Sequence, residues 1–215
     1  MLAQAPDFAE ARVLHGRASL RAGDSATALA ELLPLLAEDA GSVADPAALL
    51  DGGRAALAQK DLPKAALFYR ALCSRAALLP EPSAQVVAYI GIASALLASE
   101  KAPVDDVLAY LREARRRSAG SGLTGLCAGV TAVAWLSAGQ EAEGQGALGE
   151  ITDAEALKAF ETSKAVWLPD GLLSAVLGVA FEREHPDLGA PYFKALATSP
   201  LATTAIGKLA TRTRP

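Results

Sequence analysis

The chain has 215 residues, of which 52% are hydrophobic but only 5% aromatic, so alanine supplies much of the apolar content and favours helices. Its formal net charge of −4 argues against a general nucleic-acid binder, because neutralising phosphates needs an excess of lysine and arginine. β-branched runs are short and no alternation of period two is sustained, which predicts an all-α protein.

The two cysteines, Cys73 and Cys127, lie far apart within apolar helical patterns and do not form a disulfide framework. We expect both to be buried small hydrophobes in a reducing, cytoplasmic compartment. The first residues have neither a basic segment nor a long apolar run, so they do not resemble a secretory signal.

Turn and capping residues divide the first half of the chain into six predicted helices. Gly23-Asp24 separates the first two, and Pro34 is expected to kink the second because it lacks a backbone donor. Asp45-Pro46 and Asp61-Leu62-Pro63 each place a capping side chain before a proline of the first turn, and Ser83 is the expected cap of the fifth helix. The predicted helices cover residues 9–22, 25–39, 46–59, 62–78, 83–99 and 104–118.

The second half begins after the flexible turn 119–122. A glycine-rich stretch makes 140–150 the weakest helix of the chain. Thr152-Asp153-Ala154-Glu155 resembles a capping box, and prolines open the last three helices. The predicted helices cover residues 123–138, 140–150, 153–166, 170–184, 187–198 and 201–211.

Glycines recur at a regular interval in the first half. Gly16 and Gly53 lie 37 residues apart, and Gly91 follows 38 residues later. In the first two units an alanine, Ala28 or Ala65, stands 12 residues after the glycine; in the third unit the corresponding step is 16. A small residue at a helix crossing lets two backbones approach closely, so the spacing predicts repeated helix pairs that stack on one another.

This pattern resembles the tetratricopeptide repeat family, whose period is about 34 residues. The residues that show it best are Gly53, Asp61, Ala65 and Tyr69. The resemblance implies an α-solenoid of antiparallel pairs with about ten or eleven helices. We expect one repeat domain over residues 1–215, regular over 9–118 and degenerate over 123–211.

The resemblance also implies a function: a non-enzymatic scaffold or adaptor that holds a protein or peptide in a groove lined by the first helix of each pair. The groove residues implied for this chain are Val13, Arg17, Arg21, Leu50, Arg54, Ala58, Ala88, Ile92 and Leu96. Arg17 and Arg54 occupy matching positions of adjacent units and would attract an acidic segment or a C-terminal carboxylate. The alternative is that they are surface arginines whose aliphatic stems cover their neighbours.

A second functional hypothesis is a helical accessory or regulatory domain of a larger enzyme or signalling protein. Residues 2–8 resemble the end of a repeat's second helix closed by proline. The pattern is expected equally if the chain is a piece of a longer repeat array and if its N-terminus is frayed.

Two patterns suggest other functions. Gly144–Gly149 matches G-x-G-x-x-G, but no strand precedes it, so we expect a loose helix or a loop instead of a nucleotide site. Residues 118–140 carry no charge and could span a bilayer, although a helix buried by neighbours on several sides gives the same pattern and is favoured here. We expect no catalytic, metal or cofactor site.

Overall fold

A computed structural model describes residues 9–36, 46–79, 81–99, 103–162 and 167–211. Within these ranges all regular structure is helical, which confirms the predicted all-α class. The described residues form eleven α-helices: α1 (Ala9–Arg21), α2 (Ser25–Leu32), α3 (Pro46–Ala58), α4 (Leu62–Cys73), α5 (Pro82–Leu97), α6 (Val104–Ser118), α7 (Thr124–Ser137), α8 (Glu141–Leu148), α9 (Ala159–Thr162), α10 (Leu172–Glu184) and α11 (Pro186–Ala197). Short 3₁₀ segments follow or connect them: η1 (Leu33–Leu36), η2 (Ala76–Leu78), η3 (Glu155–Lys158), η4 (Pro200–Thr203) and η5 (Gly207–Thr211).

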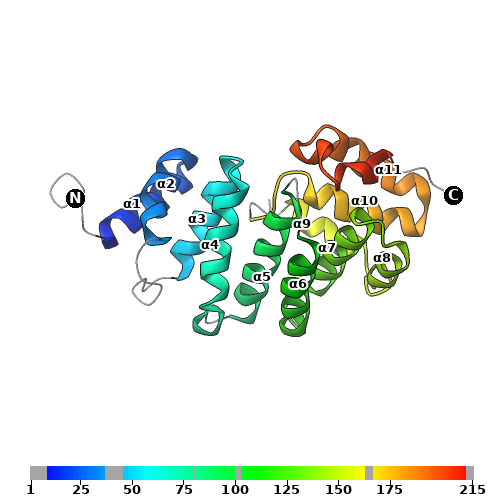
Figure 1. The fold of residues 1–215 in the computed structure, drawn as a ribbon, viewed down its shortest axis with the longest axis horizontal. Coiled ribbons are helices and arrows are strands. Elements are labelled where there is room, and N and C mark those ends of the chain that lie inside the picture. Colours follow the sequence, from blue (N-terminus) through cyan, green and yellow to red (C-terminus); the bar gives the residue numbers. More distant parts are fainter. Residues whose placement is uncertain (1–8, 37–45, 80, 100–102, 163–166, 212–215) are drawn as a thin grey trace.

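The helices pack mainly against their neighbours in sequence. Each helix from α1 to α7 contacts the next one, and α7 packs against α8 and α10 against α11 (Figure 1). The order changes at α7, which also packs against α10. The chain therefore runs from α1 at one end of the long axis to α10 and α11 near the other.

Matching turns join α1 to α2 and α3 to α4. Gly23 and Lys60 both adopt a positive φ, of 85° and 58°, and an aspartate follows each of them. The Asp24 carboxylate accepts a hydrogen bond from the Thr27 backbone N–H at 3.0 Å, and Asp61 accepts one from Lys64 at 3.1 Å. The break predicted at Gly23-Asp24 and the cap predicted at Asp61 are confirmed, and the two capping aspartates fix where the second helix of each pair begins.

Several predicted helices in the first half end early or start elsewhere. The helix predicted over 25–39 stops at Leu32 and continues as η1, because Pro34 cannot extend the α-helical ladder; its last residues, 37–39, lie outside the described ranges. The helix predicted over 62–78 ends at Cys73 and is followed by η2. Ser83 is not the cap of α5, which begins at Pro82; the Ser83 hydroxyl lies 3.3 Å from a Glu81 carboxylate oxygen.

The second half departs further from the predicted ranges. The helix predicted over 153–166 consists of η3 and the four-residue α9, and its residues 163–166 are not described. The helix predicted from 170 begins at Leu172, because Gly171 has a φ of 91° that helical residues do not adopt. The last predicted helix is two 3₁₀ segments, η4 and η5. The glycine-rich stretch forms α8.

Tyr69 on α4 joins four parts of the chain. Its side chain is fully buried, and its ring lies against Gly53 of α3 and Gly91 of α5. A Cβ atom at either glycine would come within 2.9 Å of the ring. The hydroxyl donates a hydrogen bond to the Trp167 carbonyl at 3.1 Å. The predicted role of these glycines, close approach of neighbouring helices, is thereby confirmed at this crossing.

The uncharged stretch 118–140 contains α7, a buried helix of the interior. α7 packs against α6, α8 and α10, and its apolar residues are buried on several sides. A Cβ atom on Gly129 would overlap Val176 of α10, so this glycine permits a close crossing between the two helices. Within the described residues, no helix has both the length and the hydropathy that crossing a membrane requires.

The two cysteines differ in exposure. Cys127 is buried, as predicted, and its thiol lies 3.6 Å from the Leu111 carbonyl. Cys73, at the end of α4, is only half-buried and packs against the core, so the prediction of a buried residue is met only in part there. Desolvation by burial raises the pKa of each thiol to about 12.

Both thiols should therefore react slowly in the folded protein. At pH 8 the raised pKa lowers the thiolate fraction, and the thiolate is the reactive form. We expect labelling by a disulfide reagent to be at least about a hundredfold slower than in denaturant, with Cys127 slower than Cys73 because it is less exposed. The measurement is stopped-flow labelling of the single Cys73→Ser and Cys127→Ser variants. Fast native labelling of Cys127 would contradict its position between α6 and α7.

Candidate binding pocket

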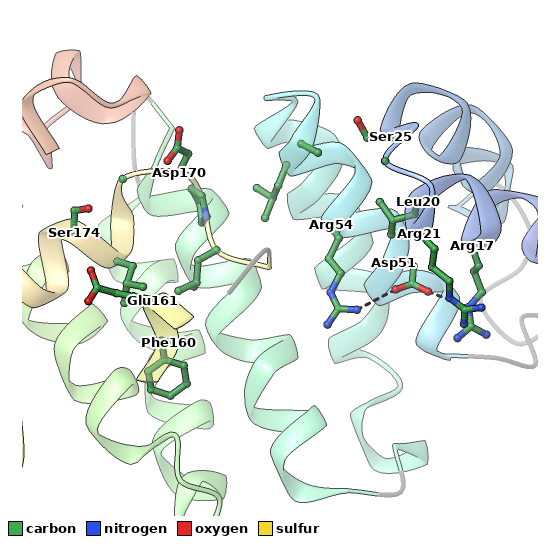
Figure 2. A pocket seen from close by; sticks show the side chains of 17 residues that line it. Arg17, Leu20, Arg21, Ser25, Asp51, Arg54, Phe160, Glu161, Asp170 and Ser174 are labelled. Carbon is green, nitrogen blue, oxygen red and sulfur yellow. Dashed lines mark hydrogen bonds and ion pairs between the residues drawn. The ribbon is translucent and has the colours of Figure 1, made fainter. Parts of the chain in front are cut away.

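A cavity of about 800 Å³ lies between the N-terminal helices and the segment around α9 and the start of α10 (Figure 2). One wall comes from α1, α3 and the turn after α1, and the other from residues 160–161 and 168–174. The first wall contains Arg17, Leu20, Arg21, Gly23, Ser25, Asp51, Arg54, Leu57 and Ala58. The second contains Phe160, Glu161, Leu168, Pro169, Asp170, Gly171, Leu173 and Ser174.

Arg17, Asp51 and Arg54 form a charged cluster on the first wall. Arg17 Nε donates to one carboxylate oxygen of Asp51 at 3.0 Å, and a terminal nitrogen of Arg54 donates to the other at 3.1 Å. Asp51 and Arg54 share a face of α3 because they are three residues apart. Arg17 reaches them because α1 packs against α3 as well as α2.

Among the described residues, the Asp51 carboxylate bonds both arginines of the cluster. The side chain of Asp51 is only 15% exposed, whereas those of Arg17 and Arg54 are 26% and 32% exposed. The Arg54 Nε atom is buried and has no hydrogen-bond partner among the described residues. Asp51 thus holds the side chains of both arginines in place at the wall of the cavity.

Arg21 adds a further positive charge to this wall. Its side chain is exposed and lines the cavity one turn beyond Arg17 on α1. In the described part of the chain it takes part in no ion pair. It is therefore available to an anionic group that enters the pocket.

The second wall combines apolar and acidic residues. Phe160, Leu168 and Leu173 supply apolar surface, and Glu161 and Asp170 are exposed. No ion pair within the described ranges involves either carboxylate. Figure 2 shows Phe160, Glu161 and Asp170 on the elements that face Arg54 across the pocket.

The structure divides the predicted groove residues into three groups. Arg17, Arg21, Arg54 and Ala58 line the pocket. Three others, Val13, Leu50 and Leu96, are half-buried and pack against the core, but they do not line the pocket. Ala88 and Ile92 are fully buried, so their assignment to an open groove is wrong. They belong to α5, which is covered by α4, α6 and α7.

Sequence reasoning missed Asp51 and the entire second wall. Asp51 could have been found, because an acidic residue three positions before Arg54 lies on the same helical face. The second wall has no local signal. It reaches the pocket only through the return of the chain after α8.

The glycine pattern at residues 144–149 and the search for metal ligands both bear on sites outside the pocket. Gly144–Gly149 lies in and directly after α8, without a strand before it, and Gly144 packs closely against Leu136; this agrees with the expected helix or loop. Among the described residues, no group of three or more His, Cys, Asp or Glu side chains could hold a metal ion.

The basic run near the end of α6 is largely paired. Arg115 lies 2.9 Å from Glu150, and Arg116 and Arg117 both contact Glu113. The Arg117 guanidinium also stacks over the Tyr89 ring, 4.8 Å from its centroid. These contacts are those of a solvated helix end, where basic side chains also complement the helix dipole.

Three comparisons with known proteins were made. No family model matches the chain, and neither a search of curated proteins nor one of solved structures found a match. The function is therefore inferred from the pocket and from the order of the helices.

Proposed function

We propose that this chain is a non-enzymatic binding scaffold or adaptor, a tetratricopeptide-like solenoid that holds a segment of another protein in its pocket. The observation that carries the proposal is the arginine wall: Arg17 and Arg54 held on Asp51, with Arg21 beside them at a cavity of about 800 Å³. A cavity of this size accommodates several side chains or a chain end.

The repeat architecture is supported by the first two helix pairs. In both, a glycine of the first helix lies against a large side chain of the second: Gly16 against Leu32 and Gly53 against Tyr69. Both pairs also use a positive-φ residue followed by a capping aspartate at the turn. Equivalent contacts at equivalent steps are typical of stacked repeats.

The occupant of the arginine wall is an acidic segment or a C-terminal carboxylate. A guanidinium presents paired donors that match a carboxylate, and each charge-assisted hydrogen bond contributes about 1.5–3 kcal/mol. Arg54 is held in position by Asp51, so little side-chain freedom is lost when a ligand binds.

Arg21→Gln tests this proposal with little effect on the fold. Arg21 is exposed and outside the Asp51 cluster, whereas removing Arg17 or Arg54 would also leave Asp51 with fewer partners. We expect the variant to bind fluorescein-labelled acidic peptides with free C-termini about tenfold more weakly, which corresponds to about 1.4 kcal/mol. The measurement is fluorescence anisotropy at low and high salt.

Arg112→Gln is the matched control. Arg112 is an exposed arginine of α6 outside the pocket, and no ion pair in the described ranges involves it. Its variant has the same net charge as Arg21→Gln and should bind like the unchanged protein. If both variants bound the peptides equally weakly, the loss would come from the lower net charge of the protein. That result would contradict binding in the pocket.

A further inference from the structure

The two walls of the pocket carry opposite charge. The described lining residues of the first wall include three arginines, Arg17, Arg21 and Arg54, and one acid, Asp51. The described lining residues of the second wall include two acids, Glu161 and Asp170, and no basic residue. The nearby Lys158 is engaged elsewhere, 2.8 Å from Glu155 and 4.6 Å from the centre of the Phe181 ring.

In the part of the chain that the structure describes, no ion pair joins the charged side chains of the two walls. Both oxygens of Asp51 are used by arginines of its own wall. Glu161 and Asp170 are exposed and form no ion pair within the described ranges. The second wall therefore attracts cations into the same cavity in which the first attracts anions.

Apolar residues on both walls complete the lining. Leu57 on α3 is half-buried, as are Phe160 and Leu173 on the other side. A ligand that binds here therefore meets arginines, apolar side chains and carboxylates in one cavity. A uniformly acidic ligand would satisfy the first wall but would be repelled by the second.

We propose that the pocket is specific for a bipolar peptide segment: a carboxylate on the arginine wall, a lysine or arginine side chain at Glu161 and Asp170, and an apolar residue between them. This inference rests on the proposed function and names the chemistry of its ligand. Matching both walls raises affinity, and the exposed acids of the second wall select against ligands that carry negative charge alone.

Three pools of fluorescein-labelled hexapeptides test the inference, each with randomised apolar central positions. The bipolar pool has lysine first and aspartate last with a free C-terminus. The acid-only pool replaces lysine with norleucine, and the cation-only pool replaces the aspartate with asparagine amide. We expect the bipolar pool to bind at least about tenfold more tightly than either other pool in anisotropy titrations.

The double variant Glu161→Gln with Asp170→Asn tests whether the second wall causes the preference for the bipolar pool. This variant should no longer prefer the bipolar pool over the acid-only pool, and it should bind the acid-only pool no more weakly than the unchanged protein does. Asp106→Asn with Glu143→Gln, exposed acids outside the pocket, changes the net charge equally and should keep the preference. All four substituted residues are exposed, so we expect the thermal midpoint of unfolding to stay nearly constant in both double variants.

The outcomes separate the two proposals. If the acid-only pool binds as tightly as the bipolar pool, and Arg21→Gln weakens both, the bipolar ligand is refuted while the binding scaffold stands. A preference that survives Glu161→Gln with Asp170→Asn also refutes the role of the second wall. If no pool binds, or if Arg21→Gln has no effect on those that do, the proposed function fails as well.

Discussion

Replacing Tyr69 with alanine is expected to lower the free energy of unfolding by about 3–5 kcal/mol. The side chain is fully buried between Gly53 and Gly91, two residues without side chains of their own to fill the space. Its hydroxyl also holds the Trp167 carbonyl, which belongs to the segment that leads into the second wall of the pocket. The substitution therefore leaves a cavity where α3, α4 and α5 meet.

Urea unfolding followed by circular dichroism measures this loss of stability. One further variant isolates the contribution of the hydroxyl, and another serves as a comparison. Tyr69→Phe keeps the ring but leaves the buried Trp167 carbonyl without its donor, which costs about 1–3 kcal/mol. Tyr110→Ala removes a half-buried tyrosine from α6 and should cost less than Tyr69→Ala. A loss for Tyr69→Ala no larger than that for Tyr110→Ala would contradict the packing described here.

The helix pairs could be predicted because their determinants are local. The glycines Gly16 and Gly53, the break at Gly23-Asp24 and the cap Asp61 act within a few turns of the chain, and the structure places each of them as expected. The same holds for the apolar stretch of α7, where freedom from charge indicates burial on several sides.

The C-terminal part was harder to predict because its capping and proline signals also suit 3₁₀ segments. Asp153 does accept a hydrogen bond from the Ala156 N–H at 3.1 Å, yet the chain continues as η3 and a single short α-helix. Pro200 similarly begins η4 and not an α-helix. Such signals mark where a helical turn starts, whereas its length depends on tertiary packing.

The candidate pocket could be predicted only in part, because only one of its walls follows from the repeat. Matching positions place Arg17 and Arg54 on one face, and the structure brings both to Asp51. The same reasoning fails for Ala88 and Ile92, since it assumes an open inner face where α5 is covered. The repeat period predicts which residues share one side of a helix. It does not predict which later segments of the chain pack against that side.

Gly53→Ala and Gly146→Ala are expected to change stability in opposite directions. Both glycines lie inside α-helices, so alanine favours the helix by about 0.5–1 kcal/mol at either position. At Gly146 nothing lies within 4 Å of the added Cβ atom, and the gain should appear in full. At Gly53 the Cβ atom would lie 2.8 Å from the Tyr69 ring, closer than a normal contact allows.

The Tyr69 ring cannot move away easily at that crossing. Gly91 bounds it on another side, and the hydroxyl is held by the Trp167 carbonyl. Overpacking of a closed core costs about 1–3 kcal/mol, which exceeds the gain in helix propensity. We therefore expect Gly53→Ala to lower the urea midpoint and Gly146→Ala to raise it, with an unchanged slope in both. A shift of the same sign in both variants would mean that α3 and α4 do not approach each other through Gly53, and the matching glycine of the repeat would lose its physical explanation.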